Sequence, residues 1–353
     1  PFIQTQYYRS EKEAITHWQK FLSGYLDASG IANEVFDQAV NLSRQEGPQL
    51  SDLMKTKGIR MITDVDTSLF YLSFNMLDNV VGGYDEKKVK LRQAISIALD
   101  SNEFLDIFRN GRGIAAQGPI PPGIFGYRDG PEGVNPFICV WDPVTRRHMR
   151  RPIEAARKLM EEAGYPGGVA ADGKPLSLHY DHSQGGDTSF RSQFEWIHKR
   201  LALLGIRLEE RGTDLSRYRE KRQQGNWQLG SGGWLADYPD PENFLFLFYG
   251  PNREAQKDGH NMTNYESKDF DALFARMESM GNTPERQKII DQMVAIIQRD
   301  APAVWQFHPV SYILTHDWYQ NVKPHQMSYN VLKYKRLDPA RRAGLQREWN
   351  HPV

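Results

Sequence analysis

The chain has 353 residues, more than a single hydrophobic core usually serves, so we expect two lobes. Its 44 Lys and Arg balance its 44 Asp and Glu, and this neutral composition favours neither a nucleic-acid partner nor an anionic membrane surface. The single cysteine, Cys139, excludes an internal disulfide, and no apolar run approaches the roughly 18 residues of a membrane span.

Helix and strand patterns alternate along the chain, which is typical of a mixed α/β protein. Helices are predicted at residues 14–22, 33–40, 89–99, 152–163, 190–201, 270–277, 289–296 and 339–349, and a further helix is expected to end near residue 224. Strands are predicted at residues 2–8, 59–62, 70–74, 176–180, 206–208, 227–234, 303–308 and 312–314. Asn33 and Asp338 are suitable helix N-caps, and Gly24 and Gly164 are expected to end helices.

This order of elements predicts two passages between lobes, near residues 64–70 and 303–308. We therefore assign residues 1–68 and 305–353 to parts of lobe I, and residues 69–304 to lobe II. Two connecting strands favour closure of the lobes around a ligand by a hinge motion.

Residues 231–244 are the stretch where we expect the ligand. Gly232 and Gly233 leave the backbone of a strand end bare, so that another backbone could approach it. Trp234 adds a flat apolar face with one N–H donor.

Two carboxylates, Asp237 and Asp240, follow in the same stretch. Pro239 and Pro241 fix the backbone there and are expected to hold both carboxylates in a stiff turn. The alternative is that the tryptophan and the aspartates serve only core packing and an Asx-turn.

The sequence offers no catalytic or metal-binding constellation, so we expect no enzyme, no cofactor and no metal. His179 and His182 point to opposite faces of a predicted strand and would not share an ion. Asp237 and Asp240 could suggest glycoside hydrolysis, but their place in one turn favours local hydrogen bonding. Cys139 lies in a predicted loop without a motif, and no G-x-S-x-G nucleophile elbow is present.

The sequence of residues 233–244, Gly-Trp-Leu-Ala-Asp-Tyr-Pro-Asp-Pro-Glu-Asn-Phe, resembles the same region of the family 5 solute-binding proteins, the dipeptide- and oligopeptide-binding proteins of ABC importers. Further similar segments follow the family's order at residues 71–75, 89–100, 110–111, 118–123, 159–165, 204–206, 264–265 and 300–302. The resemblance spans nearly the whole chain, and it depends on the order and spacing of these segments.

The resemblance implies a periplasmic binding protein-like α/β fold of the type II, peptide-binder class, with two lobes joined by two crossover strands. It also implies that the N-terminal part of the first lobe is missing, so that the chain is a C-terminal portion of its gene product. The expected function is that of a receptor that captures a peptide-like solute and delivers it to an ABC permease. We expect it to be a monomer, periplasmic or extracellular and lipid-anchored.

The resemblance also implies the ligand-binding residues. Asp237 matches the aspartate that pairs with the α-ammonium of the ligand, and Trp234 matches the family's tryptophan in the cleft. The strand edge that pairs with an extended ligand corresponds to residues 232–235. The predicted site is formed by Gly232, Gly233, Trp234, Leu235, Ala236, Asp237 and Arg222.

The chain departs from the family pattern at the anchor for a ligand carboxylate. Oligopeptide binders carry an arginine three residues before the tryptophan, where this chain has Ser231, although Arg222 matches a second arginine upstream. Dipeptide binders carry an arginine after the strand that resembles residues 176–180, and here residues 184–187 contain none. The ligand could then be a longer or modified peptide, or a sugar, an opine or a metal chelate. A chaperone-like binder of extended segments is the alternative outside transport.

Overall fold

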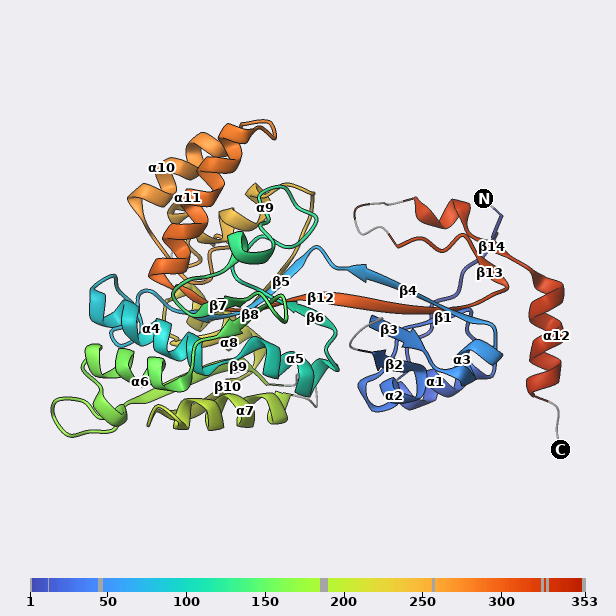
Figure 1. Cartoon of the computed structure of the whole chain (residues 1–353), viewed down its shortest axis with the longest axis horizontal. Helices are drawn as coiled ribbons and strands as arrows, with labels where there is room; N and C mark the ends of the chain where they lie inside the picture. Colours follow the sequence, from blue (N-terminus) through green and yellow to red (C-terminus); the bar gives the residue numbers. More distant parts are fainter. Residues whose placement is uncertain are drawn as a thin grey trace. The chain divides into compact units, whose positions relative to one another are not determined.

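The computed structural model describes residues 2–11, 13–43, 47–184, 190–255, 258–324, 327 and 330–350. The chain divides into two compact units, which we call unit 1 (Pro1–Asp66 and Val310–Val353) and unit 2 (Thr67–Pro309). Figure 1 shows the elements of both units. No described helix is both long enough and apolar enough to cross a membrane.

Unit 2 is built on a twisted mixed sheet. Its strands are β5 (Ser68–Phe74), β6 (Gly113–Ala115), β9 (Ser177–Ser183), β10 (Arg207–Thr213), β11 (Leu229–Leu235) and the first half of β12 (Ala303–His316). They follow the order β12-β5-β11-β9-β10, and β6 pairs with β12. β5 runs antiparallel to both of its neighbours, whereas β9 and β10 are parallel.

Helices cover both faces of this sheet (Figure 1). They are α4 (Glu86–Ala98), α5 (Ser101–Arg109), α6 (Ile153–Glu162), α7 (Phe190–Ala202), α8 (Leu215–Gln223), α9 (Glu242–Leu245), α10 (Lys268–Met277) and α11 (Pro284–Asp300). Short 3₁₀ turns lie at Gly130–Gly133, Pro166–Gly168, Phe246–Phe248 and Gly250–Asn252, and a hairpin is formed by β7 (Cys139–Asp142) and β8 (Arg147–Arg150).

The central strand β5 explains why the sheet has a core on each face. Its side chains alternate, so that Leu72 and Phe74 join one cluster with α4, α6 and α7, whereas Leu69 and Tyr71 join another with α10 and α11. Nearly every residue of β5 is buried, as expected for a strand covered on both sides.

Unit 1 has a smaller core around Trp18, Phe21 and Phe36. Its elements are α1 (Ala14–Leu22), β1 (Ala28–Ser29), η1 (Asn33–Val35), α2 (Phe36–Ala39), β2 (Val40–Ser43), β3 (Gly47–Leu50), α3 (Asp52–Thr56), β4 (Ile59–Val65), β13 (Tyr319–Gln320), η6 (Val331–Tyr334), β14 (Arg336–Leu337) and α12 (Pro339–Trp349). β4 and β1 pair with the second half of β12.

Cys139 lies in β7 and is 2% exposed. Its sulfur accepts a long hydrogen bond of 3.8 Å from Nη1 of Arg150. Burial raises the pKa of the Cys139 thiol above its usual value, although the nearby Arg150 charge opposes that shift. The thiol is therefore a packed core group.

Most predicted elements are confirmed, and five predictions are wrong. Asn33 is not an N-cap, because it is the first residue of η1 and Ala32 precedes it in the cap position. Cys139 lies in a strand and not in a loop, because residues 139–142 pair with β8. Residues 2–8 form no strand, although their side chains alternate. The predicted helix at residues 33–40 is a 3₁₀ turn followed by the short α2. The two strands predicted at residues 303–308 and 312–314 are one continuous strand, β12. In the predicted carboxylate-anchor loop at residues 184–187, only Gln184 lies within the described residues.

Candidate functional site

One edge of β11 is open over most of its length. β5 pairs with β11 along the whole strand, from Leu229 opposite Phe74 to Leu235 opposite Ser68. On the other side, β9 pairs with β11 only at Leu229. Among the residues that the structure describes, no other strand covers this second edge.

The register identifies which backbone groups face the open edge. The Ala236 N–H donates to the Thr67 carbonyl at 2.9 Å, so the even-numbered residues of this strand direct their backbone groups toward β5. Ser231, Gly233 and Leu235 therefore direct their N–H and C=O groups to the open edge. All three residues are exposed.

Two of the three glycines of β11, Gly232 and Gly233, have a packing role. A Cβ atom on Gly232 would lie 2.5 Å from the ring of Tyr71, and one on Gly233 would lie 3.1 Å from the ring of Phe70. The ring of Tyr71 therefore occupies the space that a side chain at position 232 would need, and a side chain at position 233 would crowd the ring of Phe70.

Trp234 and the backbone of Asp237 are held by one side chain, Asn243. The indole N–H donates to Oδ1 of Asn243 at 3.1 Å, and the Asp237 N–H donates to the same oxygen at 2.9 Å. Asn243 lies in α9 and is 2% exposed. A role for Asn243 was not predicted from the sequence. The only sequence feature that could have indicated one is its amide side chain in the first turn of the helix that follows Pro-Asp-Pro.

The two carboxylates of the turn have different surroundings. Asp237 is exposed, and its carboxylate has no hydrogen bond or ion pair with any described residue. Asp240 accepts two hydrogen bonds from Arg286, at 2.7 and 2.8 Å, and a third from the Glu242 N–H at 2.9 Å. Asp240 thus fixes the turn to α11.

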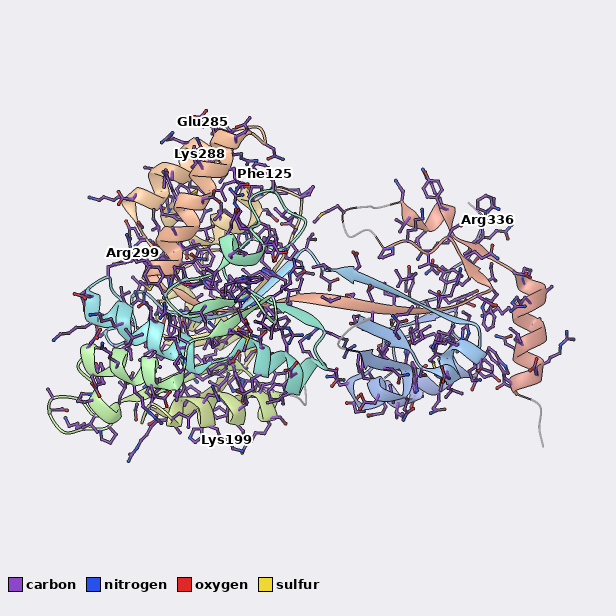
Figure 2. All side chains as sticks on the ribbon, in the orientation of Figure 1. Phe125, Lys199, Glu285, Lys288, Arg299 and Arg336 are labelled. Atoms are coloured by element: carbon purple, nitrogen blue, oxygen red, sulfur yellow. The ribbon has the colours of Figure 1, made fainter. Side chains whose placement is uncertain are left out.

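Arg286 is buried in α11, next to the exposed Glu285. Its side chain is 2% exposed, and it also donates to the Met277 carbonyl at 3.2 Å and to Asn282 at 2.7 Å. Figure 2 shows Glu285 and Lys288 pointing away from this helix into solvent. The arginine therefore contributes a buried anchor for the turn.

Arg222 is already paired with a carboxylate. Its Nε and Nη2 atoms both lie 2.8 Å from the carboxylate oxygens of Glu254, and its guanidinium lies 5.5 Å from the ring centroid of Tyr218. Burial raises the pKa of Glu254, and the Arg222 charge opposes this rise. Burial also raises the pKa of Tyr71 and brings that of Tyr218 to about 12. A ligand carboxylate would have to compete with Glu254 for this arginine.

Ser231 stands where oligopeptide binders carry an arginine. Its hydroxyl is hydrogen-bonded to the Tyr180 hydroxyl of the same unit.

The two histidines of β9 have separate partners. His182 lies 2.9 Å from Glu210, whereas His179 lies 3.3 Å from Glu209. Within the described part of the chain, no group of three or more His, Cys, Asp or Glu could hold a metal ion.

A cavity of about 480 Å³ in unit 2 is lined by residues of the 115–136 segment and α11, including Gln117, Tyr127 and Gln298. None of the predicted site residues lines it. Among the described residues, Gly233 and Leu235 thus leave backbone groups without a strand partner on the open edge of β11, and Asp237 at its end has an unpaired charge. The Ser231 N–H is hydrogen-bonded to the Tyr180 hydroxyl.

The sequence model of the bacterial extracellular solute-binding proteins, family 5 (middle region), matches residues 19–256. Heme-binding protein A of Haemophilus influenzae is 26% identical over 274 residues, which cover 75% of this chain and 44% of that protein. The periplasmic oligopeptide-binding protein OppA of Salmonella typhimurium is 26% identical over 241 residues, which cover 65% of this chain and 38% of that protein. The chain thus spans less than half the length of these curated relatives.

Solved structures share the fold. HbpA2 from Haemophilus parasuis matches with a TM-score of 0.69 and 22% identity, over 93% of this chain and 57% of that one. The periplasmic binding protein DppA from Helicobacter pylori, solved with the peptide STSA, matches with a TM-score of 0.69 and 19% identity, over 93% of this chain and 56% of that one.

Proposed function

Because the chain belongs to the family 5 bacterial extracellular solute-binding proteins, we propose that it is part of a receptor that captures a peptide-like solute and delivers it to an ABC permease. The observation that carries this proposal is the open edge of β11, which ends at the unpaired carboxylate of Asp237. The other proposed features, a monomer outside the cytoplasm without catalytic activity, rest on the family alone.

The open edge suits an extended backbone. Gly233 and Leu235 offer N–H and C=O groups at alternate positions, as a strand does to its neighbour. The Ser231 N–H is bonded to the Tyr180 hydroxyl, so a ligand would have to displace that contact. A peptide that adds to this edge would be held by its main chain, so its side chains could vary. Gly233 lacks a side chain that would obstruct this approach.

Asp237 and Trp234 would complete the binding site at the end of the strand. A ligand ammonium against the Asp237 carboxylate forms a charge-assisted hydrogen bond, roughly twice as strong as a neutral one. The indole of Trp234 is fixed by Asn243 and presents its ring beside the same strand. The relatives named for oligopeptides and the DppA structure with a bound peptide support this class of ligand.

A second candidate ligand is a non-peptide solute. Arg222 is compensated by Glu254, so this part of the site supplies no free cation for the carboxylate of a short peptide. The relative named as a heme-binding protein also supports a ligand other than a peptide. A ligand with an amine and no nearby carboxylate would fit both observations.

Calorimetry with two probes, trialanine and N-acetyl-trialanine, tests the proposal. Asp237 is exposed without a ligand, but a bound peptide would shield the pair of its ammonium and this carboxylate from water. Loss of such a shielded pair is expected to cost on the order of 3 kcal/mol, so the acetylated peptide should bind at least about a hundredfold more weakly. Equal dissociation constants would refute the role of Asp237 as the amine anchor. If neither peptide binds, and a different compound co-purifies by mass spectrometry, the non-peptide solute is correct.

A further inference from the structure

His260 is an exposed side chain beside the proposed site that the function has not used. Its ring centroid lies 5.2 Å from that of Trp234 and 5.7 Å from that of Phe246, and the last two lie 5.1 Å apart. The three rings are inclined to one another by 59° to 70°. We call Trp234, Phe246 and His260 the ring triad.

The backbone around His260 is held on both sides. The Gly259 N–H donates to the Arg253 carbonyl at 3.2 Å, and the Asn261 N–H donates to the Asn252 carbonyl at 2.8 Å. A Cβ atom on Gly259 would lie 2.0 Å from the Asn252 carbonyl oxygen, so only glycine allows this close approach. The imidazole is thus presented from a well-anchored loop.

The imidazole itself has no hydrogen bond or ion pair with any residue that the structure describes. Glu254, whose carboxylate interacts electrostatically with His260, is paired with Arg222, and Asp258 accepts a hydrogen bond from the neutral amide of Gln223 at 2.8 Å. The ring triad is therefore an aromatic surface of three mutually inclined rings. One ring N–H or lone pair of His260 is free at its edge.

We propose that the ring triad is a subsite for an aromatic side chain of the ligand and that His260 determines its specificity. This inference rests on the proposed function, which places an extended ligand along β11. A fourth ring would pack edge-to-face or offset against the inclined rings, an arrangement that aromatic side chains prefer. The polar edge of His260 would accept or donate one hydrogen bond to a tyrosine or histidine side chain.

The test compares four peptides by calorimetry: trialanine and its three variants with phenylalanine at one position. We expect one of the three phenylalanine peptides, the one whose ring reaches the ring triad, to bind about three- to tenfold more tightly than trialanine, as an aromatic contact does. A variant with cyclohexylalanine at that position, similar in size but not aromatic, should gain less. In His260→Ala the dissociation constant of trialanine should come close to that of the preferred phenylalanine peptide. In His260→Phe the preference for the phenylalanine peptide should remain.

His198→Ala is the matched control, because His198 is an exposed histidine on α7 outside the ring triad. It should keep the preference of the unsubstituted protein. A preference for phenylalanine that survives His260→Ala overturns the specificity role of His260. Peptides that bind without any preference for phenylalanine overturn the subsite but leave the proposed function intact, whereas a complete lack of peptide binding overturns both.

Discussion

The two ends of the turn that follows β11 contain the same kind of residue in opposite settings. At one end, Asp237 is exposed and its carboxylate has no partner among the described residues. At the other end, Asp240 is held by two hydrogen bonds from the buried Arg286. Asn243, in α9 three residues after Asp240, bonds both the indole of Trp234 and the Asp237 backbone.

This difference shows how a free charge can be fixed in position without being neutralised. The Asp240 end supplies the rigidity, so the Asp237 end can remain open to solvent. A site arranged in this way loses little conformational freedom when a ligand arrives, and so less of the binding energy is lost to ordering. The variants below separate the two ends.

The largest effect is expected from Asp240→Ala, which leaves the charge of Arg286 buried without its carboxylate. We expect the free energy of unfolding, measured in urea, to fall by about 3 kcal/mol. Adding Arg286→Met should recover part of this loss, because the unpaired charge is then gone. A loss below about 1 kcal/mol would show that the ion pair is not the anchor of the turn.

Asp237→Asn should lower the affinity for trialanine and leave the free energy of unfolding nearly unchanged. Trialanine should bind at least about a hundredfold more weakly, a loss of about 2.7 kcal/mol, because the ammonium loses its counter-charge. The free energy of unfolding should change by less than about 0.5 kcal/mol, as for other exposed positions. Asp269→Asn, at an exposed carboxylate in the first turn of α10, should leave the affinity for trialanine unchanged. An affinity within about threefold of the unsubstituted protein would assign Asp237 to the turn alone.

Asn243→Ala should lower both the stability of the protein and its affinity for trialanine. Two donors, the Trp234 indole and the Asp237 N–H, would lose their acceptor, and we expect about 1 to 2 kcal/mol of lost stability. Affinity for trialanine should fall as well, because the indole is no longer fixed. Affinity loss without any stability loss would instead make Asn243 a direct ligand contact.

Trp234→Ala should give the smallest effect, about a three- to tenfold loss of affinity from the missing aromatic contact. Indole fluorescence of the unsubstituted protein should change on binding, and this change should be much reduced in the variant. Trp141→Ala is the control, since Trp141 packs on His148 in the β7–β8 hairpin. An unchanged dissociation constant in Trp234→Ala would remove the tryptophan from the site.

Local signals were sufficient for much of the fold. The strand at β11, the end of α6 at Gly164 and the cap of α12 by Asp338 are set by residues close in sequence. Residues 2–8 have strand-like alternation, but a strand needs a partner, and no described strand pairs with them. At β12, the pairing changes from β5 and β6 to β4, so one strand continues past Pro309.

The site was harder to predict because its partners are distant in sequence. Asp240 and Arg286 are 46 residues apart, and Arg222 and Glu254 are 32 residues apart. Sequence spacing therefore did not show that Arg222 is compensated or that Asp240 is an anchor. His260 had no motif around it, and only the fold places it beside Trp234.

The buried thiol of Cys139 makes this chain convenient for chemical labelling. Thiol reagents attack the thiolate, and burial disfavours that form at the only cysteine. A fluorophore could therefore be attached to a single cysteine introduced by Leu235→Cys, at a side chain that is 68% exposed on the open edge, without first removing Cys139. In the unsubstituted protein, slow uptake of the same reagent would report how often the Cys139 region of unit 2 opens.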